Sequence, residues 1–414
     1  MVAIEISLET KSPLSIGTAK AYGGTLIESG SYVRGGHLRG ALAAVKPYLN
    51  KEESEQIEEV LGRGGAPDIL LPNCYPALYQ ASFPLPLTAY SCKSAEAGFR
   101  AERHGVVDTL IPRLAYDCLA DPWDKRNIPV PYRFPTCAKC GRRTEPFDGF
   151  AERIGDRQYL KSQVFRRRQT RVAINRRRLT HEESQLYSVS AIDTGTVFIG
   201  MATVDPARVQ LLFSCLGLIE RLGGRSSRGF GRVAVSARRI PSPRSVADRV
   251  RLFNDKYQSV LMDFSAIAIA GATADVGTSL FAVTLRSDAI LRTIEGLPTT
   301  ELSADALKSE LVAAAGSEQD KAAIDAIDIA LVSQHTRSII VSGWNIKWRL
   351  PKETLLASRM GGVYVYEAAV TDDQRVILNE SLARLEQRGV GEFREDGYGQ
   401  IRICDEFHTE VEPV

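Results

Sequence analysis

A glycine-rich loop at residues 223–232, G-G-R-S-S-R-G-F-G-R, constrains the fold more than any other stretch of the sequence. Asp205 and Pro206 suit the start of a helix before it, and apolar residues then recur at helical spacing. Residues 232–237 after it are typical of a strand. Because glycine tolerates positive φ angles and leaves room for a close approach, we expect a tight helix-to-strand turn that another molecule can contact.

The arginines of this loop favour contact with a sugar-phosphate chain, since the guanidinium group matches phosphate oxygens. The residues predicted to form that contact are Gly224, Arg225, Ser226, Ser227, Arg228, Gly229 and Phe230. Gly229 is expected to adopt a positive φ angle. Phe230 has two interpretations, stacking on a base or packing into the sheet, and packing is slightly favoured. The alternative for the whole loop is a simple turn with solvated arginines.

A second stretch with the same layout, R-G-V-G-E-F-R-E-D-G-Y-G, lies at residues 388–399. Thr371 and Gln374 suit a capping box before it, three leucines follow on one helix face, and residues 400–403 suit a strand. Both loops end in glycine, an aromatic residue and glycine. The second loop carries Arg394 among three acidic residues, so it suits a polyanion less well than the first.

This repetition predicts two tandem domains of the α+β class, each a sheet backed by helices, over about residues 1–240 and 241–414. A length of 414 residues allows two domains and an inserted module. In the second domain, strands are expected at residues 264–270, 279–285 and 327–332, and a helix is expected from Ser303 to Leu311.

The composition is that of an ordinary globular protein, with 44% hydrophobic and 25% charged residues. A net charge of +2 means that affinity for nucleic acid must come from local clustering of basic residues. No apolar run approaches the roughly 20 residues that span a bilayer, and the first residues lack a basic leader. We therefore expect a cytoplasmic protein without a membrane partner, in which seven cysteines favour metal ligation over disulfides.

Residues 70–150 are expected to form a Cys-rich insertion in the first domain, with the knuckle C-A-K-C-G at residues 137–141. Two thiolates at this spacing, from Cys137 and Cys140, suit one side of a tetrahedral Zn²⁺ site. A redox pair is less favoured, because such a pair usually opens a helix after a strand. Spacing alone leaves the remaining ligands open, and the candidates are Cys74, Cys92, Cys118 and His104.

Residues 160–192 are the most basic part of the chain and suit a hairpin-like arm at about residues 160–180. Seven like charges this close together repel unless a polyanion neutralises them, which favours phosphate binding over a solvated hairpin. The arginines predicted to bind phosphates are Arg166, Arg167, Arg168, Arg171, Arg176, Arg177 and Arg178.

A third candidate segment, at residues 31–43, reads as a glycine turn that opens into a helix. The free N–H groups at such a helix start suit an anion. The residues concerned are Arg34, Gly35, Gly36, His37 and Arg39. A glycine turn before a core helix is an equal alternative.

These segments together resemble the RAMP superfamily, the RRM-like (ferredoxin-like) subunits of CRISPR effector complexes. The loop G-G-R-S-S-R-G-F-G, with the helix before it and the strand after it, resembles the superfamily signature. Residues 32–42 are similar to Y-(I/V)-P-G-(S/G)-x-L-R-G-A-L, with Arg34 in place of proline. Residues 171–176 and 184–187 are similar to R-x-A-I-(D/N)-R and G-Q-L-Y, with Ser184 in place of glycine. With the segments around Cys92, His104 and the knuckle, the set resembles the Csx-ten family of type III-D CRISPR systems, most strongly over residues 31–43, 91–192 and 223–235.

The resemblance implies two tandem RRM-like RAMP domains, with a zinc-binding insertion in the first. It implies a CRISPR RNA-binding subunit of an antiviral effector ribonucleoprotein that holds the 5′ handle of the guide RNA. Implied partners are CRISPR RNA, RAMP backbone subunits, a large polymerase-cyclase-like subunit and, through the complex, target RNA. It also favours Cys92 and His104 as the remaining ligands of a structural Zn²⁺, with Cys118 as the alternate.

Two other functions compete with this interpretation. An endoribonuclease that processes precursor RNA or cleaves target RNA needs an acid–base pair, and His37 is the one histidine we would test as a catalyst. Because the five histidines are scattered and residues 10–17 contain no Asp or Glu, a non-catalytic role is favoured. A zinc-dependent adaptor for protein partners only would leave the arginine-rich arm unexplained.

Overall fold

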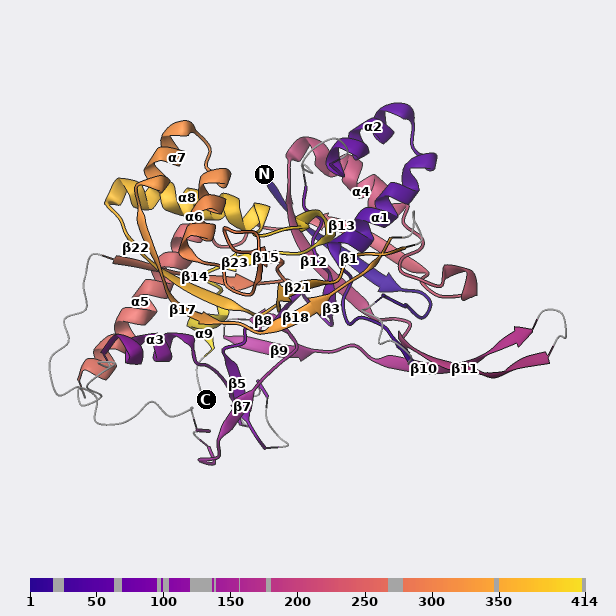
Figure 1. Ribbon diagram of the computed structural model, residues 1–414, viewed down its shortest axis with the longest axis horizontal. Helices are drawn as coiled ribbons and strands as arrows, with labels where there is room; N and C mark the ends of the chain where they lie inside the picture. The colour runs from indigo at the N-terminus through magenta and orange to yellow at the C-terminus, as the bar shows by residue number, and fades with distance from the viewer. Residues whose placement is uncertain are drawn as a thin grey trace.

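The computed structural model describes residues 1–17, 26–62, 69–94, 98–99, 104–119, 136–137, 139–155, 157–175, 180–266, 278–345 and 350–411. Its fold is mixed α and β and contains several antiparallel sheets (Figure 1). Within these ranges no helix combines the length and the apolar character needed to cross a bilayer. Two four-stranded sheets, one in each half of the chain, organise the rest.

The first sheet has the strand order β13-β1-β12-β3, and all its pairs are antiparallel. Its strands are β1 (Val2–Thr10), β3 (Tyr75–Ala77), β12 (Val197–Val204) and β13 (Val233–Arg239). Alternation along β1 turns Ile4, Ile6 and Leu8 toward the helices, where all three are fully buried. The helices that cover this face are α1 (Gly35–Val45), α2 (Lys51–Val60) and α4 (Val209–Gly217).

The second sheet has the order β17-β22-β14-β23 and is also antiparallel. Its strands are β14 (Thr278–Leu285), β17 (Asp328–His335), β22 (Val363–Ala369) and β23 (Ile401–Ile403). Its core includes residues of α5 (Val246–Ser265), α6 (Ala304–Ala314), α7 (Glu318–Asp325) and α8 (Asp372–Arg388). When the four strands of each sheet are counted along the chain, the first and third are central and the second and fourth are at the edges.

Most elements expected in the second half are present, including the Thr371–Gln374 capping box and the Ser303 cap. The strand expected at residues 264–270 is wrong. Helix α5 continues to Ser265, because its apolar face packs on the core and the backbone N–H of Ala266 donates to Met262. Residues 267–270 lie outside the described ranges.

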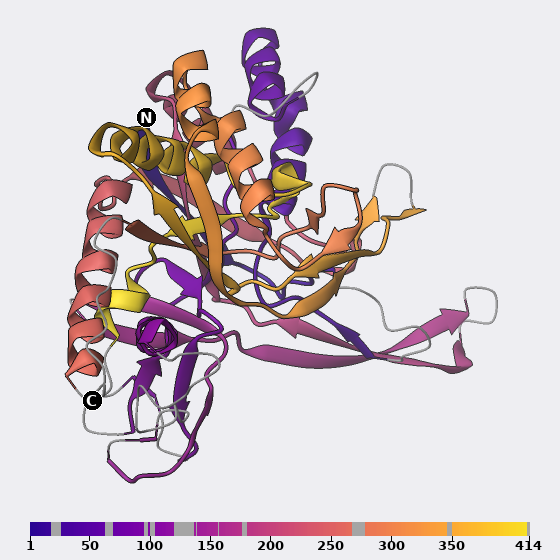
Figure 2. The same ribbon diagram turned by 60° about the vertical axis from the view of Figure 1, so that its left-hand side comes forward.

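The insertion expected at residues 70–150 is divided between several layers. Strand β3 belongs to the first sheet, while β4 (Ser82–Pro84) pairs with β8 (Phe150–Gly155), which pairs with β9 (Gln158–Ser162). A separate small sheet consists of β5 (Ala89–Cys92), β6 (Val106–Asp108) and β7 (Thr144–Pro146). It lies low in Figure 2, away from the helices above the two large sheets.

The helix of this insertion, α3 (Leu110–Leu119), packs against α5 in the core of the second half. A buried hydrogen bond of 2.9 Å between Asp108 and His408 joins the same two regions. His408 lies in the short helix α9 (Phe407–Glu410), and its other ring nitrogen is 3.0 Å from the hydroxyl of Thr284. The insertion therefore bridges both halves, which its place along the chain does not indicate.

The arm predicted at about residues 160–180 is a long antiparallel hairpin that projects from the body (Figure 1). It consists of β10 (Arg166–Asn175) and β11 (Thr180–Ile192), and β2 (Leu26–Glu28) pairs with β11 in parallel. In the second half, three short pairs lie outside the main sheet: β15 (Leu291–Arg292) with β16 (Pro298–Thr299), β18 (Ser338–Val341) with β21 (Leu355–Ser358), and β19 (Trp344–Asn345) with β20 (Leu350–Pro351). The 3₁₀ turns are η1 (Lys46–Tyr48), η2 (Pro206–Arg208), η3 (Ser226–Arg228) and η4 (Arg394–Asp396).

Candidate nucleic-acid interface and metal centre

The glycine-rich loop at residues 223–232, here the first loop, encloses the 3₁₀ turn η3 between two left-handed residues. Arg225 has a φ of 64° and Gly229 a φ of 85°, so the positive φ predicted for Gly229 is present. Gly231 also has a positive φ, and a Cβ there would lie 2.2 Å from the carbonyl oxygen of Leu222. The glycines thus permit the turn for local steric reasons.

The first loop lies against the base of the arm through Tyr187 of β11. The guanidinium of Arg225 is 5.7 Å from the centre of the Tyr187 ring, and Arg228 donates a 2.9 Å hydrogen bond to the Tyr187 hydroxyl. Sequence reasoning did not assign Tyr187 a site role. The contact places the two arginine-rich segments side by side on one surface.

Phe230 packs beneath the contact between the first loop and the arm. Its side chain is 1% exposed and packs with Val189 and Ala191 of β11, while the guanidinium of Arg171 is 4.7 Å from its ring centre. The packing interpretation of Phe230 is confirmed. Because the ring is covered, stacking on a base is excluded for this conformation, and Phe230 supports the surface without forming part of it.

The arm presents its remaining described arginines to solvent. Arg166, Arg167 and Arg168 are exposed, and Arg167 is 3.4 Å from Asp193. Because successive strand residues face opposite sides, Arg166 and Arg168 lie on the side away from the first loop. The predicted residues Arg176, Arg177 and Arg178 lie outside the described part of the chain.

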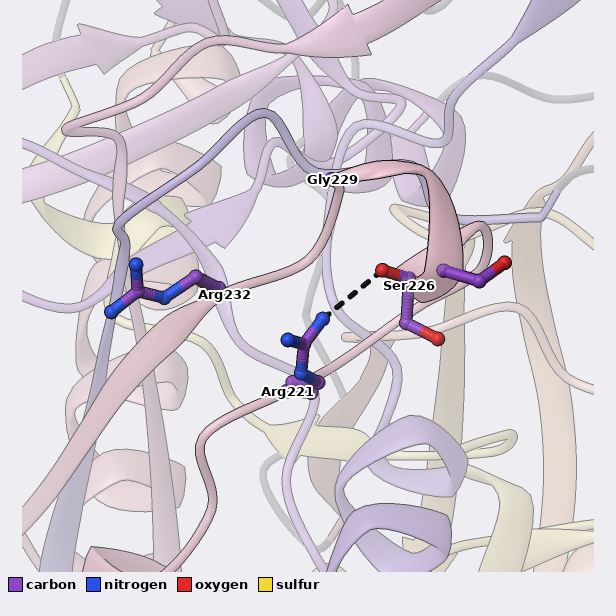
Figure 3. A pocket seen from close by; sticks show the side chains of 5 residues that line it. Arg221, Ser226, Gly229 and Arg232 are labelled. Carbon is purple, nitrogen blue, oxygen red and sulfur yellow. Dashed lines mark hydrogen bonds between the residues drawn. The ribbon is translucent and has the colours of Figure 1, made fainter.

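The first loop also borders an open pocket of about 510 Å³, which Figure 3 shows. Arg221 points toward η3 and donates a 3.0 Å hydrogen bond to the carbonyl oxygen of Ser226. The pocket is lined by Arg221, Ser226, Ser227, Gly229 and Arg232. Ser226, Ser227 and Gly229 are exposed, as is Gly224, so the backbone and hydroxyl groups predicted to contact a ligand are accessible.

The stretch at residues 388–399, here the second loop, repeats the backbone of the first. Phe393 and Gly397 flank η4 with φ angles of 54° and 91°. The hydrogen bond from Leu222 N–H to Gly231 has its equivalent in the bond from Val390 N–H to Gly399, each 2.8 Å long. The sequence similarity of the two stretches therefore reflects one conformation that occurs twice.

The surroundings of the second loop are nevertheless different, because it packs against the start of α1. Asn73, 2% exposed, accepts a 2.8 Å hydrogen bond from Gly35 N–H and donates a 2.9 Å bond to the Gly397 carbonyl. Gly36 packs closely on Asp396, where a Cβ would lie 2.9 Å from the backbone oxygen. Arg34 donates a 2.5 Å hydrogen bond to the Tyr398 hydroxyl. Groups of the protein itself thus occupy the N-terminus of α1, where the sequence predicted an anion site.

The other candidates near this contact also have internal partners. Burial, together with the charge of Arg34, lowers the pKa of His37 to about 4, so its imidazole is neutral at pH 7. Arg39 donates a 3.2 Å hydrogen bond to the Leu61 carbonyl and lies 3.7 Å from Asp396. Arg394 donates bonds of 2.7 and 2.9 Å to the two carboxylate oxygens of Glu310. These side chains therefore form contacts within the protein, some within one half and some between the halves.

The four predicted metal ligands lie together, with Cys92 in β5 and the other three outside the strands of the small sheet. The ligand atoms of Cys92, His104, Cys137 and Cys140 are all within 4.8 Å of one another. Cys92 Sγ is 3.5 Å from Cys140 Sγ, and His104 Nδ1 is 3.2 Å from Cys137 Sγ. A tetrahedral zinc site with bonds of about 2.0–2.3 Å has ligand separations of roughly 3.3–3.8 Å, so the donor set fits such an ion. The cluster could hold a metal ion, and Cys118 and Cys74 are not in it.

The knuckle favours the metal-binding form of one thiol. Burial raises the pKa of Cys137, but hydrogen bonds from His104 and from the backbone N–H groups of Cys140 and Lys139 outweigh it and lower the pKa to about 6. Burial raises the pKa of Cys92, and the neighbouring thiols of Cys140 and Cys137 raise it further. Since the thiolate is the metal ligand, Cys137 is ready to bind and Cys92 must release a proton.

Comparison with known proteins places this geometry in context. The RAMP superfamily profile matches residues 119–234, which include the arm and the first loop. A search of curated proteins finds no match.

Several solved structures show distant likeness. A chain of the type III-B Cmr-beta complex bound to cognate target RNA is 13% identical, with a TM-score of 0.39, over 96% of each chain. The structure from a study of a Cas6-related gene of Pyrococcus furiosus is 10% identical, with a TM-score of 0.36, over 98% of this chain and 99% of that one. A Cas6 product complex is 14% identical over 51% of this chain and 78% of that chain, with a TM-score of 0.32. All three TM-scores are below 0.5 and carry no assignment, so the finding that stands is the match of residues 119–234 to the RAMP superfamily profile.

Proposed function

We propose that this chain is a CRISPR RNA-binding subunit of a type III-D effector ribonucleoprotein, where it holds the 5′ handle of the guide RNA in antiviral defence. The observation that carries the proposal is the contact of the first loop with the arm through Tyr187, which brings Arg225 and Arg228 beside the arginine-rich arm. Both segments lie within the RAMP superfamily match.

The charge distribution supports RNA as the ligand. The chain as a whole has a net charge of only +2, yet Arg228 is exposed at this junction, and Arg166, Arg167 and Arg168 are exposed further along the arm, on both of its faces. Arginine forms paired hydrogen bonds with phosphate oxygens, and the exposed glycines and serines of the first loop add backbone and hydroxyl groups. The exposed ring of Phe165, at 66%, lies next to Arg166 and offers a surface for a base.

We further propose that the two halves, about residues 1–240 and 241–414, are tandem RRM-like RAMP domains. Support comes from the matching strand order of the two large sheets and from the repeated backbone of the two loops. The cluster of Cys92, His104, Cys137 and Cys140 is proposed to hold a structural Zn²⁺ that stabilises the small sheet. The proposed setting is the cytoplasm, with RAMP backbone subunits, a polymerase-cyclase-like subunit and target RNA as further partners.

A non-catalytic role is favoured over a nuclease by the position of His37, the histidine singled out as a catalyst. It lies at the contact between α1 and the second loop, where its Nδ1 atom is buried and its ring is neutral at pH 7. We expect His37→Ala to leave any ribonuclease activity of the purified protein unchanged, measured with and without Mg²⁺.

The test of RNA binding is the double variant Arg225→Ala/Arg228→Ala, with filter binding of single-stranded RNA at several salt concentrations. Each lost phosphate contact reduces the salt dependence by about 0.7, so the slope should flatten by about 1.4 and affinity should fall for every RNA sequence. The matched control is Arg251→Ala/Arg375→Ala, which removes two exposed arginines from α5 and α8. Unchanged affinity and slope in the first variant would mean that the loop is only a turn.

A further inference from the structure

The buried carboxylate of Glu152 accepts hydrogen bonds from the backbone of an exposed turn at residues 78–80. The side chain of Glu152, in β8, is 0% exposed, and its oxygens accept hydrogen bonds from three successive backbone N–H groups. The donors are Leu78, Tyr79 and Gln80, at 2.6, 2.8 and 3.0 Å. The hydroxyl of Ser162 donates a fourth bond of 2.5 Å. Successive N–H groups that surround an anion form a nest, and the internal charge makes this one rigid.

The rigid turn presents two large apolar side chains to solvent. Tyr79 is 74% exposed and Leu78 is 59% exposed. Folding ordinarily covers aromatic rings, so a ring that is exposed on an immobilised backbone is placed where a ligand can cover it. The backbone at Tyr79 is already ordered, so a molecule that stacks on the ring has less conformational entropy to lose.

Tyr79 lines a groove of about 1770 Å³ that runs between the two halves of the chain. One wall is the helix-free face of the first sheet, including Glu5, Ile199 and Met201, the last 57% exposed. The other wall includes the end of α8 and part of the second loop. Nine arginines and five carboxylates line the groove, and most of the arginines pair with carboxylates in the lining or just outside it.

Several of these arginines pair with carboxylates of the protein, while others extend into solvent. Arg402 pairs with Glu386 and Glu406, and Arg286 pairs with Asp405. Arg238 pairs with Glu5 at 2.8 Å while its side chain stays 70% exposed, and the exposed Arg244 also lines the groove. Exposed arginines near an exposed aromatic ring are the combination that binds a single-stranded polynucleotide, through phosphates and bases respectively.

The groove is separate from the surface formed by the first loop and the arm. Strand β13 begins at Val233, next to the first loop, and ends at Arg239, next to the groove residues Arg238 and Ile240. Its seven residues span about 20 Å at roughly 3.3 Å per residue. The two surfaces therefore lie at opposite ends of one strand.

We propose that Tyr79 is a stacking platform for an unpaired base of a single-stranded RNA that lies in this groove, with its phosphates near Arg238 and Arg244. The inference rests on the proposed RNA-binding function and adds a second contact region to it. A single strand is favoured over a protein partner because the groove contains both solvent-exposed arginines and an exposed aromatic ring.

The test compares Tyr79→Ala with Tyr79→Phe in the full chain, by measuring the affinity for a single-stranded RNA at several salt concentrations. Loss of one stacked base lowers affinity about 5- to 150-fold. The slope with salt should stay unchanged in Tyr79→Ala, because the ring displaces no counterions, and Tyr79→Phe should keep the affinity. Tyr48→Ala, which removes a tyrosine 80% exposed on η1, is the control for loss of an exposed ring.

Each outcome is decisive. Wild-type affinity in Tyr79→Ala, with weakened binding in Arg225→Ala/Arg228→Ala, overturns the platform and retains the proposed function. An equal loss of RNA affinity in Tyr79→Ala and Tyr79→Phe overturns stacking. Stacking is also overturned if Tyr79→Ala loses the binding of a protein partner while its RNA affinity stays intact. Absence of RNA binding by the wild-type protein overturns both proposals. Because Tyr79 is exposed, all variants should melt as the wild type does.

Discussion

The two loops permit a matched test of how much the contact between the halves contributes to stability. Gly229 and Gly397 each follow a 3₁₀ turn, with φ angles of 85° and 91°. Replacement of either by alanine imposes similar backbone strain. Their surroundings differ: nothing lies within 4 Å of a Cβ at Gly229, whereas a Cβ at Gly397 lies 2.4 Å from Asn73 Oδ1 and 2.8 Å from Gly35 N.

The magnitudes follow from these contacts. A left-handed alanine costs about 1–2 kcal/mol, and the stiffer unfolded chain offsets about 0.4–1 kcal/mol, so Gly229→Ala should cost about 1 kcal/mol. In Gly397→Ala the methyl group also displaces Asn73, which leaves buried N–H and carbonyl groups without their bonds at about 1–3 kcal/mol each. We expect Gly397→Ala to cost about 2–4 kcal/mol more than Gly229→Ala.

The assay is urea denaturation of both variants, with the midpoints compared at equal slope. Asn73→Ala supplies the control, because in that background the methyl group at position 397 has no amide to displace. The penalty of Gly397→Ala should then fall but stay above that of Gly229→Ala, because Gly35 N still lies 2.8 Å from the new methyl group. A double-mutant cycle measures the part that depends on Asn73 as coupling. Equal destabilisation by both glycine variants in the wild-type background would refute the role of Asn73 in joining the halves.

Three further predictions concern other parts of the chain. The pKa of His37 is lowered from 6.5 to about 4 in the folded protein, so the unfolded state binds the proton first as the pH drops. The free energy of unfolding should therefore fall by about 3 kcal/mol between about pH 6.5 and pH 4. His37→Gln should remove this part of the pH dependence of urea denaturation. Cys137→Ser should abolish stoichiometric zinc in metal analysis and accelerate hydrogen exchange in β5–β7, whereas Cys118→Ser, outside the cluster, should not. Glu152→Gln should cost about 1–3 kcal/mol in thermal unfolding and accelerate hydrogen exchange at Leu78, Tyr79 and Gln80, because their charged acceptor is lost.

The sequence by itself determined the features that depend on neighbouring residues. The positive φ of Gly229, the capping box at Thr371 and the hairpin of β10 and β11 are local, because backbone sterics and short-range hydrogen bonds decide them. The C-x-x-C spacing likewise predicted a metal-binding knuckle, and the family resemblance supplied Cys92 and His104 as its partners.

Only the tertiary structure decided which of two similar loops is covered. The two share one backbone conformation, yet Asn73 bonds both Gly35 and Gly397, the latter 324 residues further along the chain. The first loop instead meets the arm at Tyr187. The tertiary structure likewise decided that α3 packs in the core of the second half and that the backbone of Tyr79 is bonded to the buried Glu152. Contacts between residues far apart in the chain depend on how whole sheets and helices pack, and local periodicity carries no information about that packing.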